Sequence, residues 1–364
     1  NELKFNVIEF PTGKEVNGWV IPKKWEVKKA LLKKDGKVIY DGMNHPLGVI
    51  CYSQSFKGKI NLRDLKNHLY YHKNQPNALV YHYKMFYRPW LKDWGFSIPY
   101  NLYKRLKPGD YEVELVTTHE SSTMKVLEYH IQGELDETIT FLAHTCHPGQ
   151  ANDDLSGVAV GVDIMKKLDK NKKNRYSYKL LLGPEQFTSV FYLNNLKPVE
   201  LKKLKYGFYL EAVGHKNRLA LQKTFNGDTQ LDNAVIHYFS KNFENYYIDS
   251  FRQVLGNCET VWEAPGYEIP TISLSRAEPA KSKKPFPEYH TSLDNIDIIS
   301  SKSLDETIKS VLGIIGIIET NFAMERTYNG FIALSNPKFD LFIDAHDVSL
   351  NDKEEATWNW QNLM

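Results

Sequence analysis

The apolar positions in the first third of the chain come in short runs separated by turn residues. Residues 25–32 alternate between apolar and polar positions, and Asp35-Gly36 separates them from a second run at residues 37–40. Two such runs joined by an Asp-Gly dipeptide are typical of a β-hairpin. Residues 62–71 have helical spacing instead, and Asn61 before them is a favourable N-cap. Further short strands are expected at residues 18–22, 46–52 and 111–117.

One segment of this β-rich module, residues 80–95, is strongly aromatic. Two interpretations fit it. The rings can form the core of a packed β-layer, or they can form one wall of an extended ligand cleft. The aromatic residues concerned are Tyr81, Tyr83, Phe86, Tyr87, Trp90 and Trp94.

From about residue 125 the pattern changes to apolar strands that alternate with amphipathic helices. This alternation predicts an α/β fold with a mainly parallel, mixed sheet flanked by helices. Chemistry in such sheets collects in the loops at the carboxyl ends of the strands. Strands are expected at residues 128–132, 138–143, 178–183, 206–213 and 271–274, and helices at residues 156–168, 189–196, 229–243 and 304–322.

The net charge and the length of the longest apolar stretch limit the kinds of binding partner that we expect. Lys and Arg total 46 against 44 Asp and Glu, a formal net charge of +2. This near balance gives no electrostatic reason to bind nucleic acid or an anionic membrane. The longest apolar stretch, near residues 311–318, is far shorter than a membrane span. We therefore expect neither nucleic acid nor a membrane as a partner, and leave a homo-oligomer open.

The three cysteines, Cys51, Cys146 and Cys258, are too few and too odd in number for a disulfide framework. Such usage is typical of a reducing compartment. No apolar signal segment is visible near the N-terminus. We therefore expect a cytoplasmic protein, whose numbering can begin inside a longer chain because its first residue is Asn1 rather than methionine.

The densest polar cluster, HTCHPGQANDDLSG, follows directly after the expected strand that ends at Ala143. It contains His144 and His147 and an aspartate pair. Imidazole nitrogen and carboxylate oxygen are ligands that zinc prefers. Asp153 is the better candidate for a carboxylate shared between two metal ions, because Asp154 lies closer to the following helix and can cap it instead.

Three further polar residues follow expected strands or loops. Glu185, in GPEQF, can act as a general base or ligate a metal, although a glutamate at a helix N-terminus is also favoured by the helix dipole. Glu211, at the end of a buried strand, is costly unless it is paired or bound to a metal. His290, in PEYHTSLDN, follows a loop rich in lysine and proline and completes a ligand set, and Asp294 can orient an imidazole or begin the last helical region.

In their order along the chain, these motifs resemble the zinc aminopeptidases that hold a cocatalytic pair of metal ions. The similarity extends over residues 10–325 and is closer still to the aminopeptidase-like proteins associated with polysaccharide biosynthesis. The segments that carry it are GKEVNGWVIPKKWEV, the DWGF around Trp94, HTCHPGQANDDLSG and YHTSLD. The resemblance implies a zinc exopeptidase-like fold with a small β-rich inserted domain at residues 14–115. The peptidase-like domain then comprises residues 1–13 and 116–325, and residues 326–364 form a C-terminal extension, the start of a truncated further domain.

The resemblance also implies roles for single residues. His144 corresponds to the first metal histidine, Asp153 to the bridging aspartate and His290 to the late metal histidine. Glu211 stands where the family has an aspartate ligand, and Glu185 stands at a glutamate pair that supplies a catalytic base and a ligand.

This chain departs from that pattern at three positions. Cys146 replaces the aspartate that would hold His144, and Gln186 replaces the second glutamate of the pair. His147 is additional, and it either takes the place of His144 as the ligand or joins it on one ion. One zinc ion is at least as compatible with these changes as two.

The function that follows is zinc-dependent hydrolysis of an amide or peptide bond, with Glu185 as the proton shuttle. The expected substrate is a peptide or an amide-bearing small molecule. The alternative is a catalytically decayed, peptidase-like binding module in a polysaccharide biosynthesis context. A third hypothesis is that the histidines bind a metal ion with a structural role only. Chelation would then unfold the protein, and no hydrolase activity is expected.

Overall fold

The computed structural model describes residues 3–171, 173–278, 284–322, 325–339 and 341. The chain divides into two compact units, Asn1–Thr320 and Asn321–Met364. Every helix and strand described below belongs to the first unit. Of the C-terminal extension expected at residues 326–364, the part from residue 342 onward lies outside the described residues.

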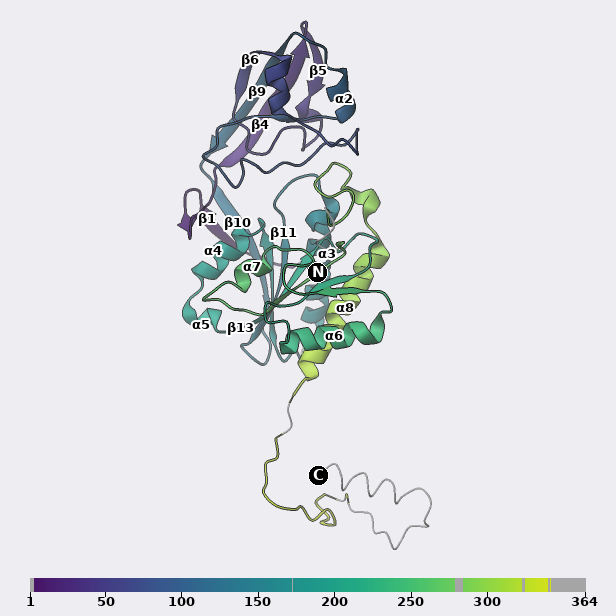
Figure 1. Ribbon diagram of the computed structural model, residues 1–364. Coiled ribbons are helices and arrows are strands. Elements are labelled where there is room, and N and C mark those ends of the chain that lie inside the picture. Colours follow the sequence, from purple (N-terminus) through teal and green to yellow (C-terminus); the bar gives the residue numbers. More distant parts are fainter. Residues whose placement is uncertain (1–2, 172, 279–283, 323–324, 340, 342–364) are drawn as a thin grey trace. The chain divides into compact units, whose positions relative to one another are not determined.

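An eight-stranded mixed sheet forms the centre of the first unit (Figure 1). Its middle strands β12, β11, β13 and β16 run parallel to one another, whereas β1 with β10, β10 with β12, and β14 with β16 pair antiparallel. The predicted mainly parallel, mixed sheet is therefore confirmed. In sheet order the strands are β1 (Asn6–Pro11), β10 (Thr123–Ile131), β12 (Ser177–Gly183), β11 (Thr138–His144), β13 (Leu204–Glu211), β16 (Thr271–Ser275), β14 (Ala220–Gln222) and β15 (Tyr247–Asp249).

Helices cover both faces of this sheet (Figure 1). One face packs against α3 (Ser156–Lys170), α6 (Gln230–Asn242) and α8 (Ser301–Thr320), in a core that includes Phe141, Ile164 and Val311. The other face packs against α4 (Phe187–Asn195) and α7 (Glu259–Trp262), with α5 (Pro198–Leu201) beside them. Because both faces are covered, all seven residues of β11 are buried, as expected of a central strand in a parallel sheet.

A second, antiparallel sheet has the strand order β5-β4-β9-β6. The hairpin predicted around Asp35-Gly36 is confirmed: both residues have positive φ, 49° and 73°, which a two-residue type I′ turn requires. The helix predicted at residues 62–71 ends early, because residues 69–70 pair with residues 96–97 instead. The elements are β4 (Lys24–Lys34), β5 (Lys37–Asp41), β6 (Phe56–Asn61), β9 (Asp110–Glu120), α1 (Leu62–Leu65), β7 (Leu69–Tyr70), β8 (Phe96–Ser97) and α2 (Tyr100–Arg105).

This smaller sheet has a hydrophobic core of its own, built from Leu32, Leu115, Trp94 and Phe96 among others. Its strands lie between residues 24 and 120, after β1 and before β10. A short hairpin of β2 (Glu15–Val16) and β3 (Trp19–Val20) connects β1 to it. The domain bounds expected from the sequence stay a prediction.

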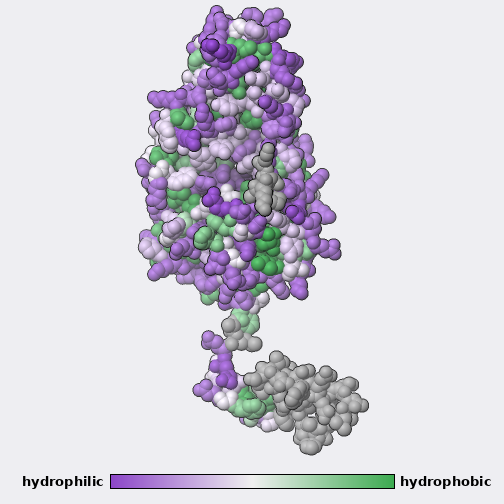
Figure 2. Space-filling model, in the orientation of Figure 1, coloured by the Kyte–Doolittle hydropathy of each residue, from purple (hydrophilic) through white to green (hydrophobic). Residues whose placement is uncertain are grey.

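The face of the molecule in Figure 2 is mostly hydrophilic, with hydrophobic residues scattered among polar ones. Among the described residues, no helix combines the length and the apolar character that crossing a bilayer requires.

Candidate metal centre

The candidate site lies at one edge of the large sheet, where three parallel strands end. His144 is the last residue of β11, Glu185 follows β12 by two residues, and Glu211 is the last residue of β13. The registry aligns His144 with Gly183, the last residue of β12. Since neighbouring parallel strands end at the same edge, the three side chains are brought together, and His144 Nε2 lies 3.4 Å from Glu211 Oε1.

Asp153 is the centre of the arrangement. Its side chain is only 2% exposed, and its two oxygens face different histidines. Oδ1 lies 3.1 Å from His144 Nε2, whereas Oδ2 lies 3.2 Å from His290 Nε2 and 3.5 Å from His147 Nε2. The sequence left open whether His144 and His147 compete for one role. The structure places them on opposite oxygens of the same carboxylate.

Two other aspartates hold the segment that carries Asp153. Asp154 accepts backbone N–H groups from His144, from Gly157 in the first turn of α3 and from Ala212 after β13. Its predicted role in capping α3 is confirmed. Asp154 therefore joins two strand ends to the helix and leaves Asp153 to face the histidines.

Asp294 has a role that neither interpretation of the sequence foresaw. Among the described residues its carboxylate bonds to no imidazole, and Asn295 rather than Asp294 caps the short helix that follows. It accepts the backbone N–H groups of Ala151, Asn152 and Asp153, at 3.2, 2.7 and 3.1 Å. Three successive donors that converge on one buried carboxylate fix the loop between β11 and α3.

His290 is positioned by the aromatic segment of the β-rich module. Tyr81 N–H donates to the carbonyl oxygen of His290 at 2.8 Å, and Val80 pairs with Thr291 in a β-bridge. His290 has a φ of 56°, in the left-handed region that non-glycine residues rarely adopt and that the surrounding contacts must maintain. The Tyr81 ring also packs 4.2 Å from that of His147. The segment at residues 80–95 is thus mostly irregular chain beside the site, with no strand in its described residues outside the single bridge of Val80.

Several buried polar atoms at the site have no hydrogen-bond partner among the described residues: His144 Nε2, His147 Nε2, Asp153 Oδ2 and Glu211 Oε2. Leaving such atoms unsatisfied costs about 1–3 kcal/mol each. Two sets of three ligand atoms lie within 4.8 Å of one another, His147 with Asp153 and His290, and His144 with Asp153 and Glu211. The donor set therefore fits a divalent cation of the zinc type at either position, and Asp153 is common to both.

The electrostatics of the site agree with this fit. Burial raises the pKa of Glu211 to about 7. Burial also opposes ionisation of Asp153, yet its contacts with His144, His147 and His290 hold the pKa of its carboxyl well below its usual range. Contacts with Cys146 and Asp153 outweigh burial and raise the pKa of His144 and of His147, so without a metal ion protons on these two imidazoles balance the buried carboxylate. A cation would displace those protons, which couples metal binding to proton release.

Glu185 and Cys146 lie on the far side of the His144 ring. Cys146 Sγ is 3.4 Å from His144 Nδ1 and 3.8 Å from Glu185 Oε2. These three side chains form a third group that could hold a metal ion. The thiol of Cys146 thus stands beside His144 Nδ1 and links the histidine to Glu185.

A buried chain of polar contacts supports Glu211 from below. Asn257 Nδ2 donates to Glu211 Oε1 at 2.8 Å, and Asn257 N–H donates to Glu259 Oε1 at 2.8 Å. Burial raises the pKa of Glu259 to about 8, so this carboxyl is mostly protonated at neutral pH. Sequence motifs gave no signal for Asn257, because it lies in a loop without a recognisable motif.

Comparisons with known proteins place this geometry in context. A family model described as Domain of unknown function (DUF4910) matches residues 1–321. A protein from Clostridium acetobutylicum, whose name assigns it to polysaccharide biosynthesis with an aminopeptidase-like domain, is 32% identical over 330 residues. The match covers 90% of this chain and 72% of the relative.

Solved structures show the same similarity. A crystal structure from Clostridium acetobutylicum that is named as a peptidase has 31% identity and a TM-score of 0.78, over 87% of this chain and 73% of that one. A zinc aminopeptidase from Bacillus subtilis has 14% identity and a TM-score of 0.62, over 87% and 84% of the two chains. At that identity the second likeness shows the fold alone.

Proposed function

The chain belongs to the family described as Domain of unknown function (DUF4910), with an aminopeptidase-like fold, and we propose that it is a zinc-dependent hydrolase of amide or peptide bonds. The observation that carries the proposal is the buried Asp153 carboxylate, which three histidines contact. Of these atoms, His144 Nε2, His147 Nε2 and Asp153 Oδ2 have no hydrogen-bond partner among the described residues. A role in polysaccharide biosynthesis and a cytoplasmic location remain part of the proposal.

The residues would divide the work as follows. Asp153 would hold metal on both oxygens, with His144 and Glu211 on one side and His147 and His290 on the other. When bound, zinc supplies a Lewis acid that polarises a carbonyl and lowers the pKa of water towards about 7. Asp294 and Asp154 keep the loop between β11 and α3, which we call the ligand loop, in place. The buried Asn257 orients the carboxylate of Glu211.

Glu185 is the proposed proton shuttle. It lies at the same sheet edge as the ligands, within reach of His144 and Cys146, and is only half-buried. It would accept a proton from the attacking water and deliver it to the leaving amine. Burial raises the pKa of the phenols of Tyr81 and Tyr87, and the charge of Glu185 adds to this shift. Both phenols therefore stay neutral and do not compete for the proton.

The test separates metal binding from chemistry. Glu185→Gln should retain the zinc content of the wild-type protein and lose amide hydrolysis by about 100-fold or more, the usual contribution of a general base. The exposed Glu120 at the end of β9 offers a matched control, and Glu120→Gln should behave as wild type. The measurements are metal content by mass spectrometry and release of amine from a panel of aminoacyl anilides and peptides.

Two results would argue against the proposal. Unchanged turnover in Glu185→Gln would exclude the shuttle. A protein that binds zinc stoichiometrically but hydrolyses no peptide or amide of the panel would favour the binding module instead.

A further inference from the structure

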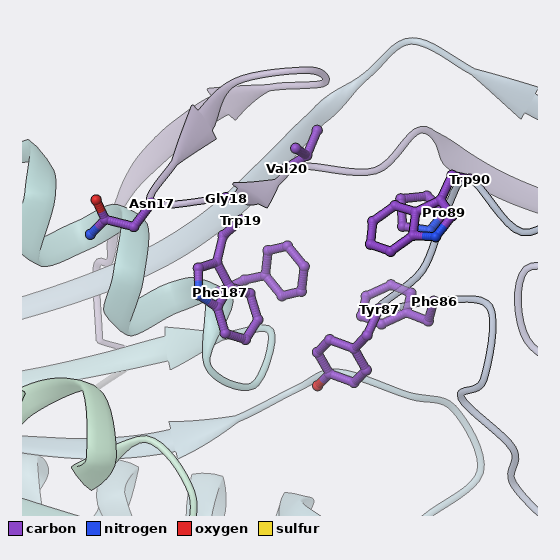
Figure 3. Close-up of a pocket in the computed structure, with 9 residues that line it drawn as sticks. All are labelled: Asn17, Gly18, Trp19, Val20, Phe86, Tyr87, Pro89, Trp90 and Phe187. Atoms are coloured by element: carbon purple, nitrogen blue, oxygen red, sulfur yellow. The ribbon is translucent and has the colours of Figure 1, made fainter.

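A pocket lined by aromatic rings includes Phe187, which follows Glu185 by two residues (Figure 3). We call it the aromatic pocket and define it by Trp19, Phe86, Tyr87, Trp90 and Phe187. Its volume is about 250 Å³, and Asn17, Gly18, Val20 and Pro89 complete the lining. The rings come from three separate parts of the chain: the β2–β3 hairpin, the segment of the β-rich module at residues 86–90, and the first residue of α4.

One wall of the pocket is preformed. Trp19 meets Phe187 edge-on with ring centroids 5.2 Å apart, and it meets Tyr87 edge-on at 6.2 Å. Tyr87 in turn stacks on Phe187 at 5.9 Å. Because each of these rings is held by the others, the wall needs no rearrangement to receive a ligand.

The opposite wall is open. Trp90 leaves 70% of its surface exposed, and in Figure 3 its indole lies across the pocket from Trp19 and Phe187. A large aromatic side chain left in water beside a preformed wall is a surface that gains free energy when a second apolar group covers it.

The pocket connects to the reacting groups. Phe187 follows Glu185 by two residues, and the Tyr87 ring stacks on that of Phe187. A second cavity of about 330 Å³ shares Phe86 and Phe187 with the aromatic pocket and is also lined by Cys146 and Pro184. Cys146 is 3.8 Å from Glu185. A substrate whose amide bond lies at Glu185 can therefore place its neighbouring substituent between the two walls.

The lining specifies the chemistry of that substituent. None of the nine described residues that line the pocket carries a charge, so nothing compensates a charged group for the water it would lose there. Aromatic faces favour a ring with an apolar face, which stacks between them. This chemistry is shared by an aromatic side chain and by the apolar face of a sugar ring.

We propose that the aromatic pocket is a specificity subsite that binds an uncharged ring of the substrate, next to the amide bond presented to Glu185. This inference rests on the proposed hydrolase function. It assigns the choice of substrate to the stacking of that ring between Trp90 and the wall of Trp19 and Phe187.

The experiment compares anilides that differ only in this substituent, together with one sugar amide. Alanine, phenylalanine and lysine anilides share one leaving group, and the acetamide of N-acetylglucosamine provides the sugar arm. The wild-type protein should prefer a ring-bearing substrate over the alanine anilide by about tenfold or more in kcat/KM. Trp90→Ala should lose most of that preference, because kcat/KM should fall much more for the ring-bearing substrate than for the alanine anilide. Because Trp90 is mostly exposed, this variant should fold normally.

A variant with another exposed aromatic ring removed serves as the matched control. Phe225→Ala removes an aromatic ring that is 73% exposed elsewhere and should keep the wild-type preference. Preference for phenylalanine or for the sugar names the source of the ring. Equal turnover of ring and alanine substrates, a preference for lysine, or an equal loss on all substrates in Trp90→Ala would overturn the proposal.

If no arm is hydrolysed, the proposed function fails and binding alone decides. Titration with phenylalaninamide or N-acetylglucosamine should then give a saturable change in tryptophan fluorescence that Trp90→Ala abolishes. The absence of any saturable change would overturn the subsite as well.

Discussion

Replacing Asp294 by asparagine should loosen the ligand loop without touching any proposed metal ligand side chain. In the wild-type protein Asp294 Oδ1 accepts the N–H groups of Ala151 and Asn152, and Oδ2 accepts that of Asp153. An asparagine in its best orientation keeps the first two bonds. Its NH₂ group then faces the Asp153 N–H, donor against donor, in a site where Asp294 is fully buried.

The size of the effect follows from those contacts. One hydrogen bond to a charged acceptor is lost and one buried N–H is left unsatisfied, which together cost about 2–5 kcal/mol in the free energy of unfolding. Metal affinity should fall about 10- to 100-fold, the usual effect of removing an outer partner that orients a ligand. Flipping the amide does not rescue the variant, since two N–H groups would then face a donor.

The assay measures both quantities. Urea unfolding of the chelated protein gives the stability, and zinc titration against a competing chelator gives the affinity. Asp297→Asn is the control, because Asp297 is exposed and lies in the turn that follows (Ile296–Ile298). Wild-type zinc affinity in Asp294→Asn, with or without the loss of stability, would refute the claim that this carboxylate positions Asp153.

Two further predictions test the buried surroundings of the site. Glu259 has a pKa of about 8 against the usual 4.5, so between these values the unfolded chain ionises while the folded protein does not. Wild-type stability should therefore fall as pH rises from 4.5 to 8, by at most about 5 kcal/mol. Glu259→Gln lacks this loss, so its stability relative to wild type should increase from pH 5 to pH 8 in urea unfolding of the chelated protein, and a pH-independent difference would contradict the assignment. Gly157→Ala would place a Cβ 2.2 Å from the Leu210 carbonyl oxygen and 2.5 Å from Asp154 Oδ1, and should cost more than about 3 kcal/mol in thermal unfolding. Gly316→Ala, which meets no atom within 4 Å in α8, should not destabilise the protein, and similar unfolding temperatures for the two variants would show that the contact at Gly157 relaxes.

Local patterns were sufficient for the parts of the fold that are long and regular. The apolar runs of β11, β12 and β13 and the Asp-Gly turn between β4 and β5 were predicted because their own residues determine them. The short strands β14 and β15 were not predicted. Each has three residues, which are too few to show the alternation of apolar and polar positions that is typical of a strand. The helix after Asn61 was extended too far, since Leu69 and Tyr70 pair with residues 96–97, a non-local choice that no helical periodicity reveals.

The same distinction between local and non-local information applies to the residues of the candidate site. His144, Asp153 and His290 were selected as candidates from sequence motifs, and the structure places both histidines in contact with the Asp153 carboxylate. What the sequence could not assign were the partners that are distant in the chain. Asp294 binds a loop about 140 residues away, and the backbone of Tyr81 holds His290 from the β-rich module. Such contacts depend on how the domains pack, so they leave no local signal.

The position of His147 accounts for one departure from the zinc aminopeptidases that the sequence resembles. Gln186 stands where those enzymes have a second glutamate, which would remove one anionic ligand. In this chain His147 reaches the same oxygen of Asp153 as His290 does, and Tyr81 packs against its ring. A neutral imidazole in place of a carboxylate would preserve the number of ligands and raise the net charge of the site. In the proposed site, the substitution and the additional histidine together would exchange one ligand for another.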